Sequence, residues 1–152
     1  MTRMINTNRR LTGGAKLLAQ DYLITTTQGR AIDGLISPAT LTTAGALTLT
    51  AAQLLGGLIL RDPNGSGRTD TLPTATLLNE YLGRPKAGTA FRFTIRNTAD
   101  AAETITIQAG TGGTTSGTMT IAQNNTKRFI VVMTNTTNSP AYTVYSEGTF
   151  VH

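Results

Sequence analysis

TAFRFTIRN, residues 89–97, is the stretch of sequence that decides the fold class. Apolar and polar residues alternate along it: phenylalanines and an isoleucine fall on one side, and arginines and a threonine on the other. Successive side chains of an extended strand point to opposite faces. The alternation therefore predicts a β-strand with one buried and one exposed face.

Four more segments toward the C-terminus favour strands. They are ETITIQA (103–109), TMTIA (118–122), KRFIVVMTN (127–135) and AYTVYSEGTFV (141–151). KRFIVVMTN is apolar on both faces, which indicates a central strand. The connectors between these segments are rich in Gly, Asn and Thr. Short strands with frequent turn signals predict an all-β fold, a small antiparallel β-sandwich of jelly-roll-like or immunoglobulin-like type.

Upstream of this stretch the pattern is more varied. ALTLT (46–50) and QLLGGLILR (53–61) are predicted strands, the second with a bulge at its paired glycines. DPNGSG (62–67) predicts a turn. LPTATLLNEYLG (72–83) predicts one short helix with Pro73 in its first turn. Its expected apolar stripe is Leu77, Leu78, Tyr81 and Leu82.

Residues 1–44 show no sustained period and are predicted to form an extended N-terminal arm, with at most one short helix at 15–23. The expected division is therefore an arm, 1–44, and a β-sandwich domain, 45–152. Thirty extended residues reach roughly 100 Å, which is enough to cross onto neighbouring subunits. Such an arm could take part in an assembly.

The arm also holds most of the net charge of the chain, which is +5. Residues 1–30 have five basic groups and Asp21, which gives 5 − 1 = +4. A basic arm on a nearly neutral body predicts contact with an acidic surface, either protein or nucleic acid. The candidate contact residues are Arg3, Arg9, Arg10, Lys16 and Arg30.

The turn at 62–70 carries three competing interpretations. A strand, a glycine-rich loop and a helix could hold a nucleotide phosphate, but no lysine follows the glycines as a P-loop requires. Asp62, Asn64 and Asp70 supply oxygen ligands of the type that calcium prefers. Asp and Asn are also ordinary turn formers, so we favour a plain turn over either ligand site.

Catalytic and membrane functions find little support. The chain has no cysteine, and its one histidine is the last residue, His152. Nucleophilic systems of the Ser–His or Cys–His type are therefore not expected, and neither is an enzyme, a cofactor or a metal. The longest apolar run, LLGGLIL at 54–60, is far shorter than a membrane span.

Arg92, Arg96, Lys127 and Arg128 could form a basic face for nucleic acid. Proteins that bind single strands usually place aromatic side chains among such charges. Here the phenylalanines of 89–97 alternate with the arginines and point to the opposite face. We therefore favour isolated, solvated charges.

Residues 69–150 resemble a module of virion structural proteins of tailed bacteriophages and other large DNA viruses. The likeness is to the small β-sandwich domains of capsid decoration (cement) proteins and of head or tail fibres. The motifs that carry it are LPTA before the helix, F-x-F-x-I-x-N, T-I-T-I-x-A-G-T-G, G-T-M-T-I-A, and a last strand with alternating tyrosines.

The resemblance implies a non-enzymatic decoration protein, commonly a homotrimer, that binds the major capsid protein on the outer surface of the virion. The arm would then grip the shell and stabilise it. Two alternatives remain open: a fibre or adhesin module that binds host glycans, and an internal virion protein that contacts nucleic acid through the basic arm. Nucleic acid is the less favoured partner, and no membrane contact is expected.

Overall fold

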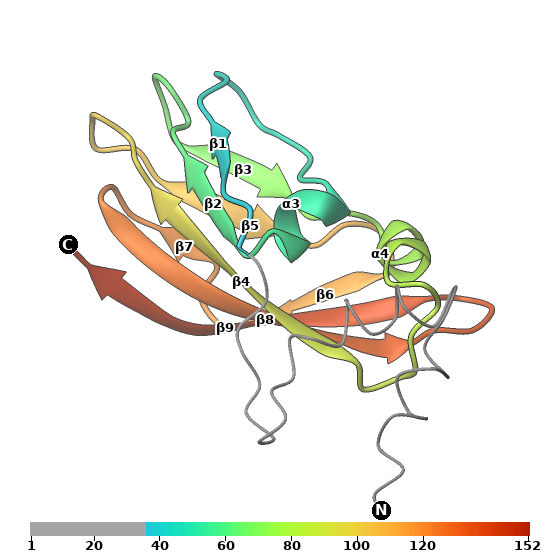
Figure 1. The fold of residues 1–152 in the computed structure, drawn as a ribbon. Helices are drawn as coiled ribbons and strands as arrows, with labels where there is room; N and C mark the ends of the chain where they lie inside the picture. The colour runs from blue at the N-terminus through green and yellow to red at the C-terminus, as the bar shows by residue number, and fades with distance from the viewer. Residues whose placement is uncertain (1–35) are drawn as a thin grey trace, which may run out of the picture. The chain divides into compact units, whose positions relative to one another are not determined.

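The computed structural model describes residues 36–152, and in that part the chain is mostly β (Figure 1). One sheet has six strands in the order β1-β2-β4-β8-β9-β6, and the other has three in the order β3-β5-β7. The strands are β1 (Ala39–Leu41), β2 (Leu58–Arg61), β3 (Arg68–Thr71), β4 (Ala90–Asn97), β5 (Ile105–Gln108), β6 (Gly113–Ser116), β7 (Thr120–Ile121), β8 (Asn125–Asn135) and β9 (Ala141–Val151). The helices of this part are α3 (Ala51–Leu55) and α4 (Ala75–Tyr81).

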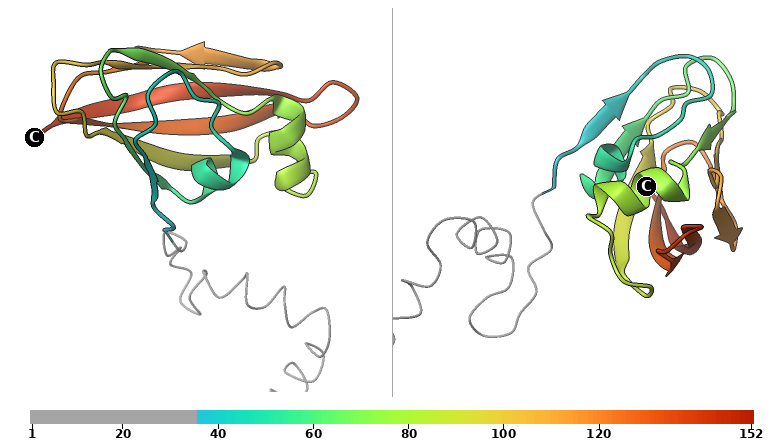
Figure 2. Two further views of the ribbon diagram at one scale, coloured as in Figure 1. Left: turned by 90° about the horizontal axis from the view of Figure 1, so that it is seen from above. Right: turned by 90° about the vertical axis from the view of Figure 1, so that its right-hand side faces the viewer.

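The five strands predicted from residue 89 onward are confirmed as β4, β5, β7, β8 and β9. β8 lies between β4 and β9, as its apolar character predicted. β8 and β9 are the longest strands, and they run side by side along the body in all views (Figures 1 and 2). β6 falls in a segment interpreted as a connector, because its residues are Gly, Thr and Ser with no apolar alternation.

The expectation of purely antiparallel sheets is wrong. β4–β8, β8–β9 and β5–β7 are antiparallel, but β1–β2, β2–β4, β3–β5 and β6–β9 are parallel. Parallel neighbours need a crossover between them. α3 lies in the crossover from β1 to β2, and β3 and α4 lie in the crossover from β2 to β4. The sheets are therefore mixed.

The two strands predicted before the turn are only partly confirmed. ALTLT (46–50) forms no strand beyond an isolated bridge between Thr48 and Thr71, and QLLGGLILR (53–61) is a strand only in its second half, as β2. Its first half lies in α3, where the prediction is wrong. Thr50 caps α3: its side chain accepts a hydrogen bond from the Gln53 N–H, and the Gln53 side chain accepts one from the Thr50 N–H. This reciprocal capping box satisfies two backbone donors at the start of the helix. The paired glycines form no bulge. They end the helix, with Gly57 at a φ of +83°.

The predicted helix at 72–83 is confirmed as α4, but its details differ. Thr74 is the N-cap and accepts a hydrogen bond from the Leu77 N–H, so Pro73 precedes the cap. Leu78 is fully buried, whereas Leu77 and Tyr81 are 54% and 59% exposed. The predicted apolar stripe is therefore wrong for these two residues.

One hydrophobic core serves both sheets and both helices. The inward positions of β4, β8 and β9 contribute Phe93 and Ile95, Phe129, Val131 and Met133, and Tyr142 and Val144. The rings of Phe93 and Phe129 stack with their centroids 5.1 Å apart. The three-stranded sheet adds Ile105, Ile107 and Ile121, and the helices add Leu54 and Leu78. The alternate positions of the six-stranded sheet therefore face away from this core.

The described part of the predicted arm, residues 36–44, belongs to the same compact unit as the sheets. It contains β1, which pairs with β2 at the edge of the six-stranded sheet. The compact unit that contains both sheets therefore includes residues 36–44, which the sequence assigns to the arm. The rest of the predicted arm, including its short helix at 15–23, lies outside the described residues.

Candidate functional site

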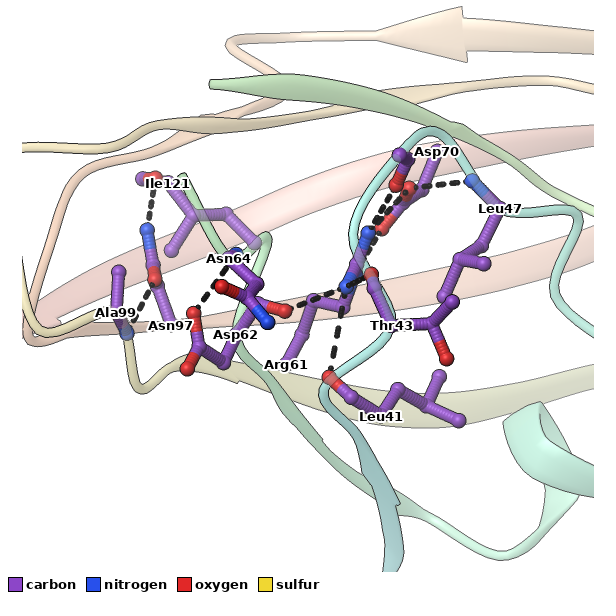
Figure 3. Close-up of polar contacts among 11 residues, drawn as sticks. Leu41, Thr43, Leu47, Arg61, Asp62, Asn64, Asp70, Asn97, Ala99 and Ile121 are labelled. Atoms are coloured by element: carbon purple, nitrogen blue, oxygen red, sulfur yellow. Dashed lines mark hydrogen bonds and ion pairs between the residues drawn. The ribbon is translucent and has the colours of Figure 1, made fainter. Parts of the chain in front are cut away.

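The predicted contact residues Arg3, Arg9, Arg10, Lys16 and Arg30 lie outside the described residues. Their role stays a prediction. The described chain does contain a polar centre, where the segment from Leu41 to Leu47 packs against β2 and β3, and it was not predicted (Figure 3).

A buried ion pair forms this centre. Arg61, at the end of β2, and Asp70, in β3, are each 1% exposed. The Arg61 Nε donates to Asp70 Oδ2 at 2.8 Å, and its Nη2 lies 3.3 Å from Oδ1. Because Asp70 lies in β3 and Arg61 in β2, the pair joins the two sheets.

The remaining hydrogen-bonding groups of the pair hold the chain that leads into the body. Arg61 donates to the carbonyl oxygens of Thr43 at 2.8 Å and Gly45 at 2.6 Å, and more weakly to that of Leu41 at 3.5 Å. Asp70 Oδ1 accepts a hydrogen bond from the Leu47 N–H at 2.8 Å. Figure 3 shows the segment from Leu41 to Leu47 curving around the guanidinium. We call this arrangement the Arg61 clamp.

The local sequence explains how the Arg61 clamp forms. Arg61 follows Ile59 by two residues, so both side chains point inward from β2. Gly45 has a φ of +104°, which lets the preceding chain turn so that successive carbonyls reach the guanidinium. A guanidinium carries five N–H donors and no acceptor, which suits it to this ring of oxygens.

The Arg61 clamp uses Asp70, one of the three residues considered as calcium ligands in the segment 62–70. Asp70 is committed to Arg61, and Asp62 Oδ1 accepts a hydrogen bond from the Asn64 N–H at 2.9 Å within the turn. Within residues 36–152, no three side chains of the His, Cys, Asp or Glu type are grouped so as to hold a metal ion.

The glycine-rich loop is fastened to the smaller sheet by a carboxylate. Glu103 is 6% exposed, and its Oε1 accepts a hydrogen bond from the Gly65 N–H at 2.7 Å. A buried carboxylate at the loop repels a phosphate and already occupies one of the amides that a phosphate would use. The favoured interpretation as a turn agrees with this geometry.

The four cations considered for a basic face are not on one face. Lys127 points inward, is 3% exposed, and donates to the carbonyl oxygens of Thr118 and Thr120 at 2.8 and 2.7 Å. Burial lowers the pKa of its ammonium group. The alternation along β4 and β8 places the three arginines, Arg92, Arg96 and Arg128, on the outer face.

Comparison of the chain with protein-family models, with curated proteins and with solved structures found no match. Among the described residues, no helix is long and apolar enough to cross a membrane. The functional argument therefore depends on the residues themselves.

The Arg61 clamp was missed because its parts looked unrelated in the sequence. Asp70 was considered only as a calcium ligand, and Arg61 only as the end of an apolar run. The sequence LILR gives no clear signal, because the three residues before Arg61 are all apolar and do not show which face of the strand is buried. The structure places Arg61 on the buried face with Ile59. An arginine at an inward position requires an internal partner, because a buried unpaired charge is strongly unfavourable.

Proposed function

We propose that the protein is a capsid decoration protein: residues 1–35 attach it to the outer surface of a capsid, and the β body assembles as a homotrimer. In this proposal the body is a jelly-roll-like sandwich built on the six-stranded and three-stranded sheets. The resemblance of residues 69–150 to virion modules supports it. So does the concentration of positive charge before residue 31, five basic groups against one acid.

The observation that carries the proposal is the Arg61 clamp. A protein that grips through its N-terminal segment must transmit tension from that segment to its body. A pulling force on residue 36 would be resisted by three sets of contacts in turn. These are the Ser37–Gly56 hydrogen bond, the pairing of β1 with β2, and the hydrogen bonds from the buried Arg61 guanidinium to the carbonyls of Thr43 and Gly45. A plain surface tail would need no buried ion pair at its root.

The test is attachment to capsids of the virus whose genome encodes the chain. The full chain should co-sediment with empty capsids, and a variant that lacks residues 1–30 should stay in the supernatant as a folded oligomer. A variant with glutamine at Arg3, Arg9, Arg10, Lys16 and Arg30 should bind more weakly at low salt. Its difference from the full chain should shrink with added salt, because salt screens the charges that the full chain uses. Glutamine at Arg84 and Lys86, two exposed cations of the body, is the control and should bind normally.

Decoration of capsids at full occupancy by the truncated chain would overturn the proposed role of the arm. Failure of the full chain to bind any form of the capsid would overturn the proposed function as a whole. Analytical ultracentrifugation of both forms tests the trimer separately.

A further inference from the structure

The outer face of β4, β8 and β9 carries cations and aromatic rings in a regular arrangement. Backbone pairing aligns Arg92 of β4 with Ile130 of β8 and Tyr145 of β9 in one row across the sheet. It aligns Arg96 with Thr126 and Phe150 in a second row. Each row therefore has an arginine at one end and an aromatic residue at the other.

The two rows are separated by four residues of β4, or roughly 13 Å. Within a row the arginine and the aromatic residue are two strand spacings apart, or about 10 Å. Between the rows Arg128 lies opposite Gly148, which has no side chain. The Arg128 guanidinium lies over the Phe150 ring, 5.6 Å from its centroid.

The aromatic rings of this face are accessible. Tyr145 and Phe150 are 41% and 50% exposed, although their neighbours Tyr142 and Val144 are fully buried in the core. Exposed aromatic rings on a sheet that also has a buried apolar face are available for contact with a ligand. The phenylalanines of β4 point away from the arginines, as the sequence predicted. The aromatic residues Tyr145 and Phe150 of β9 lie on the same outer face as the arginines.

Charge on this face is positive but not uniform. Its three arginines face one carboxylate, Glu147, whose Oε1 and Oε2 each accept from the Arg92 Nε at 3.0 Å. Arg96 and Arg128 form no ion pair with a carboxylate of residues 36–152. A second copy presenting the same face would bring these like charges together, which disfavours self-association through it.

We propose that this face binds single-stranded nucleic acid. Bases stack on Tyr145 and Phe150, and phosphates contact Arg96 and Arg128. A strand of nucleic acid offers flat rings and negative charges in alternation. The face offers two exposed rings, Tyr145 and Phe150, and two arginines, Arg96 and Arg128, that form no ion pair with a carboxylate of residues 36–152. Base stacking on aromatic side chains and a basic track for the backbone are the two requirements of binding single strands without sequence preference. An acidic protein surface would need the cations but would leave the two rings unused.

The experiment measures binding of a fluorescent oligo-dT strand by anisotropy over a range of salt concentrations. The protein is the full chain in which Arg3, Arg9, Arg10, Lys16 and Arg30 are replaced by glutamine, so that the N-terminal cations do not contribute. Two variants of the face, Tyr145→Ala with Phe150→Ala and Arg96→Gln with Arg128→Gln, are compared with this parent. Arg84→Gln with Lys86→Gln removes the same charge elsewhere and is the matched control.

The aromatic variant should bind at least about tenfold more weakly, because each stacked base contributes to affinity, with the salt dependence unchanged. The arginine variant should also weaken binding and should reduce the slope of log K against log salt by about 1.4, or about 0.7 for each lost phosphate contact. Glu147→Gln should tighten binding, because it removes an anion from the face. This variant tests the proposal even if the others fold poorly.

Three results would overturn the proposal. The first is equal weakening by the Arg84 and Lys86 control, which would mean that only net charge matters. The second is equal affinity for a duplex of the same length, which would mean that no base stacks. The third is binding of an acidic peptide but not of the oligonucleotide, which would assign the face to a protein partner.

Discussion

At the scale of single residues, the buried ion pair should dominate the response to substitution. Asp70→Ala should lower the free energy of unfolding by about 3–5 kcal/mol, because the Arg61 guanidinium remains buried without its counter-charge. The change is measured by urea denaturation, with Asp100→Ala at an exposed position as the control. A loss below about 1 kcal/mol would mean that water reaches the guanidinium.

The same site allows a sharper test through its carbonyl partners. Replacing both members of a buried ion pair by leucine is often neutral. Here the double variant Arg61→Leu with Asp70→Leu should remain about 2 kcal/mol less stable than the parent, because the carbonyls of Thr43 and Gly45 lose their donor. A double variant as stable as the parent would show that these carbonyls are satisfied by solvent.

Tyr142 links stability to pH. Its hydroxyl donates to the Pro73 carbonyl and accepts from the Gly110 N–H, and burial raises its pKa above the ordinary value of 10.0. The folded state therefore keeps this proton at a pH where the unfolded chain has lost it. The stability contributed by the neutral phenol is fully present below 10.0 and is lost as the pH rises through the raised pKa.

Tyr142→Phe should therefore lower stability at neutral pH by about 1–3 kcal/mol, because two buried polar partners lose their hydrogen bonds. Above 10.0 the difference between parent and variant should shrink. Urea denaturation of both proteins, from neutral pH to about one pH unit above 10.0, measures this difference in stability. Lys127 titrates in both proteins, so its effect on stability cancels when the two are compared. A constant difference would contradict the assignment of the alkaline loss to Tyr142.

At the scale of elements, substitution by alanine should affect stability very differently at two glycines of the six-stranded sheet. A Cβ at Gly113 in β6 would overlap the ring of Tyr142, whereas a Cβ at Gly148 in β9 would meet no atom within 4 Å. Gly113→Ala should cost about 1–3 kcal/mol by overpacking. Gly148→Ala should stay within about 0.5 kcal/mol of the parent, as measured by urea denaturation. Equal effects would mean that β6 moves away from β9 at little cost.

Elements with strong periodicity could be predicted from the sequence, and those formed by pairing or capping could not. β4 follows from alternation alone, and β8 follows from its continuous apolar run. β6 has the sequence GTTS and becomes a strand only because it pairs with β9. α3 depends on the side chains of Thr50 and Gln53, a signal of two residues inside a segment that otherwise resembles a strand. Parallel pairing is likewise not encoded in any local period.

At the scale of the whole molecule, the candidate site was harder to predict than the fold. The Arg61 clamp joins β2, β3 and a loop between β1 and α3, and its contacts are set by tertiary packing. Neither the inward position of Arg61 nor its partners could be read from the sequence, because the residues before it in LILR are all apolar. On the outer face, the rows containing Tyr145 and Phe150 follow from the register of β8 and β9, which includes a shift between Arg128 and Phe129. A bulge of this kind leaves no mark in the pattern of the sequence.

The boundary of the body provides the last prediction. The core cluster and the hydrogen bonds that form the Arg61 clamp are present within residues 36–152, so we expect a fragment of this range to unfold with the same midpoint as the full chain. A fragment that begins at residue 46 lacks β1 and the carbonyls of Thr43 and Gly45, so Arg61 would lose acceptors and β2 would become an edge. Its free energy of unfolding should fall by several kcal/mol, or about 1 kcal/mol or more for each buried donor left unpaired. Urea denaturation of the two fragments measures the difference. Equal midpoints would mean that residues 36–45 do not stabilise the body and belong to the arm.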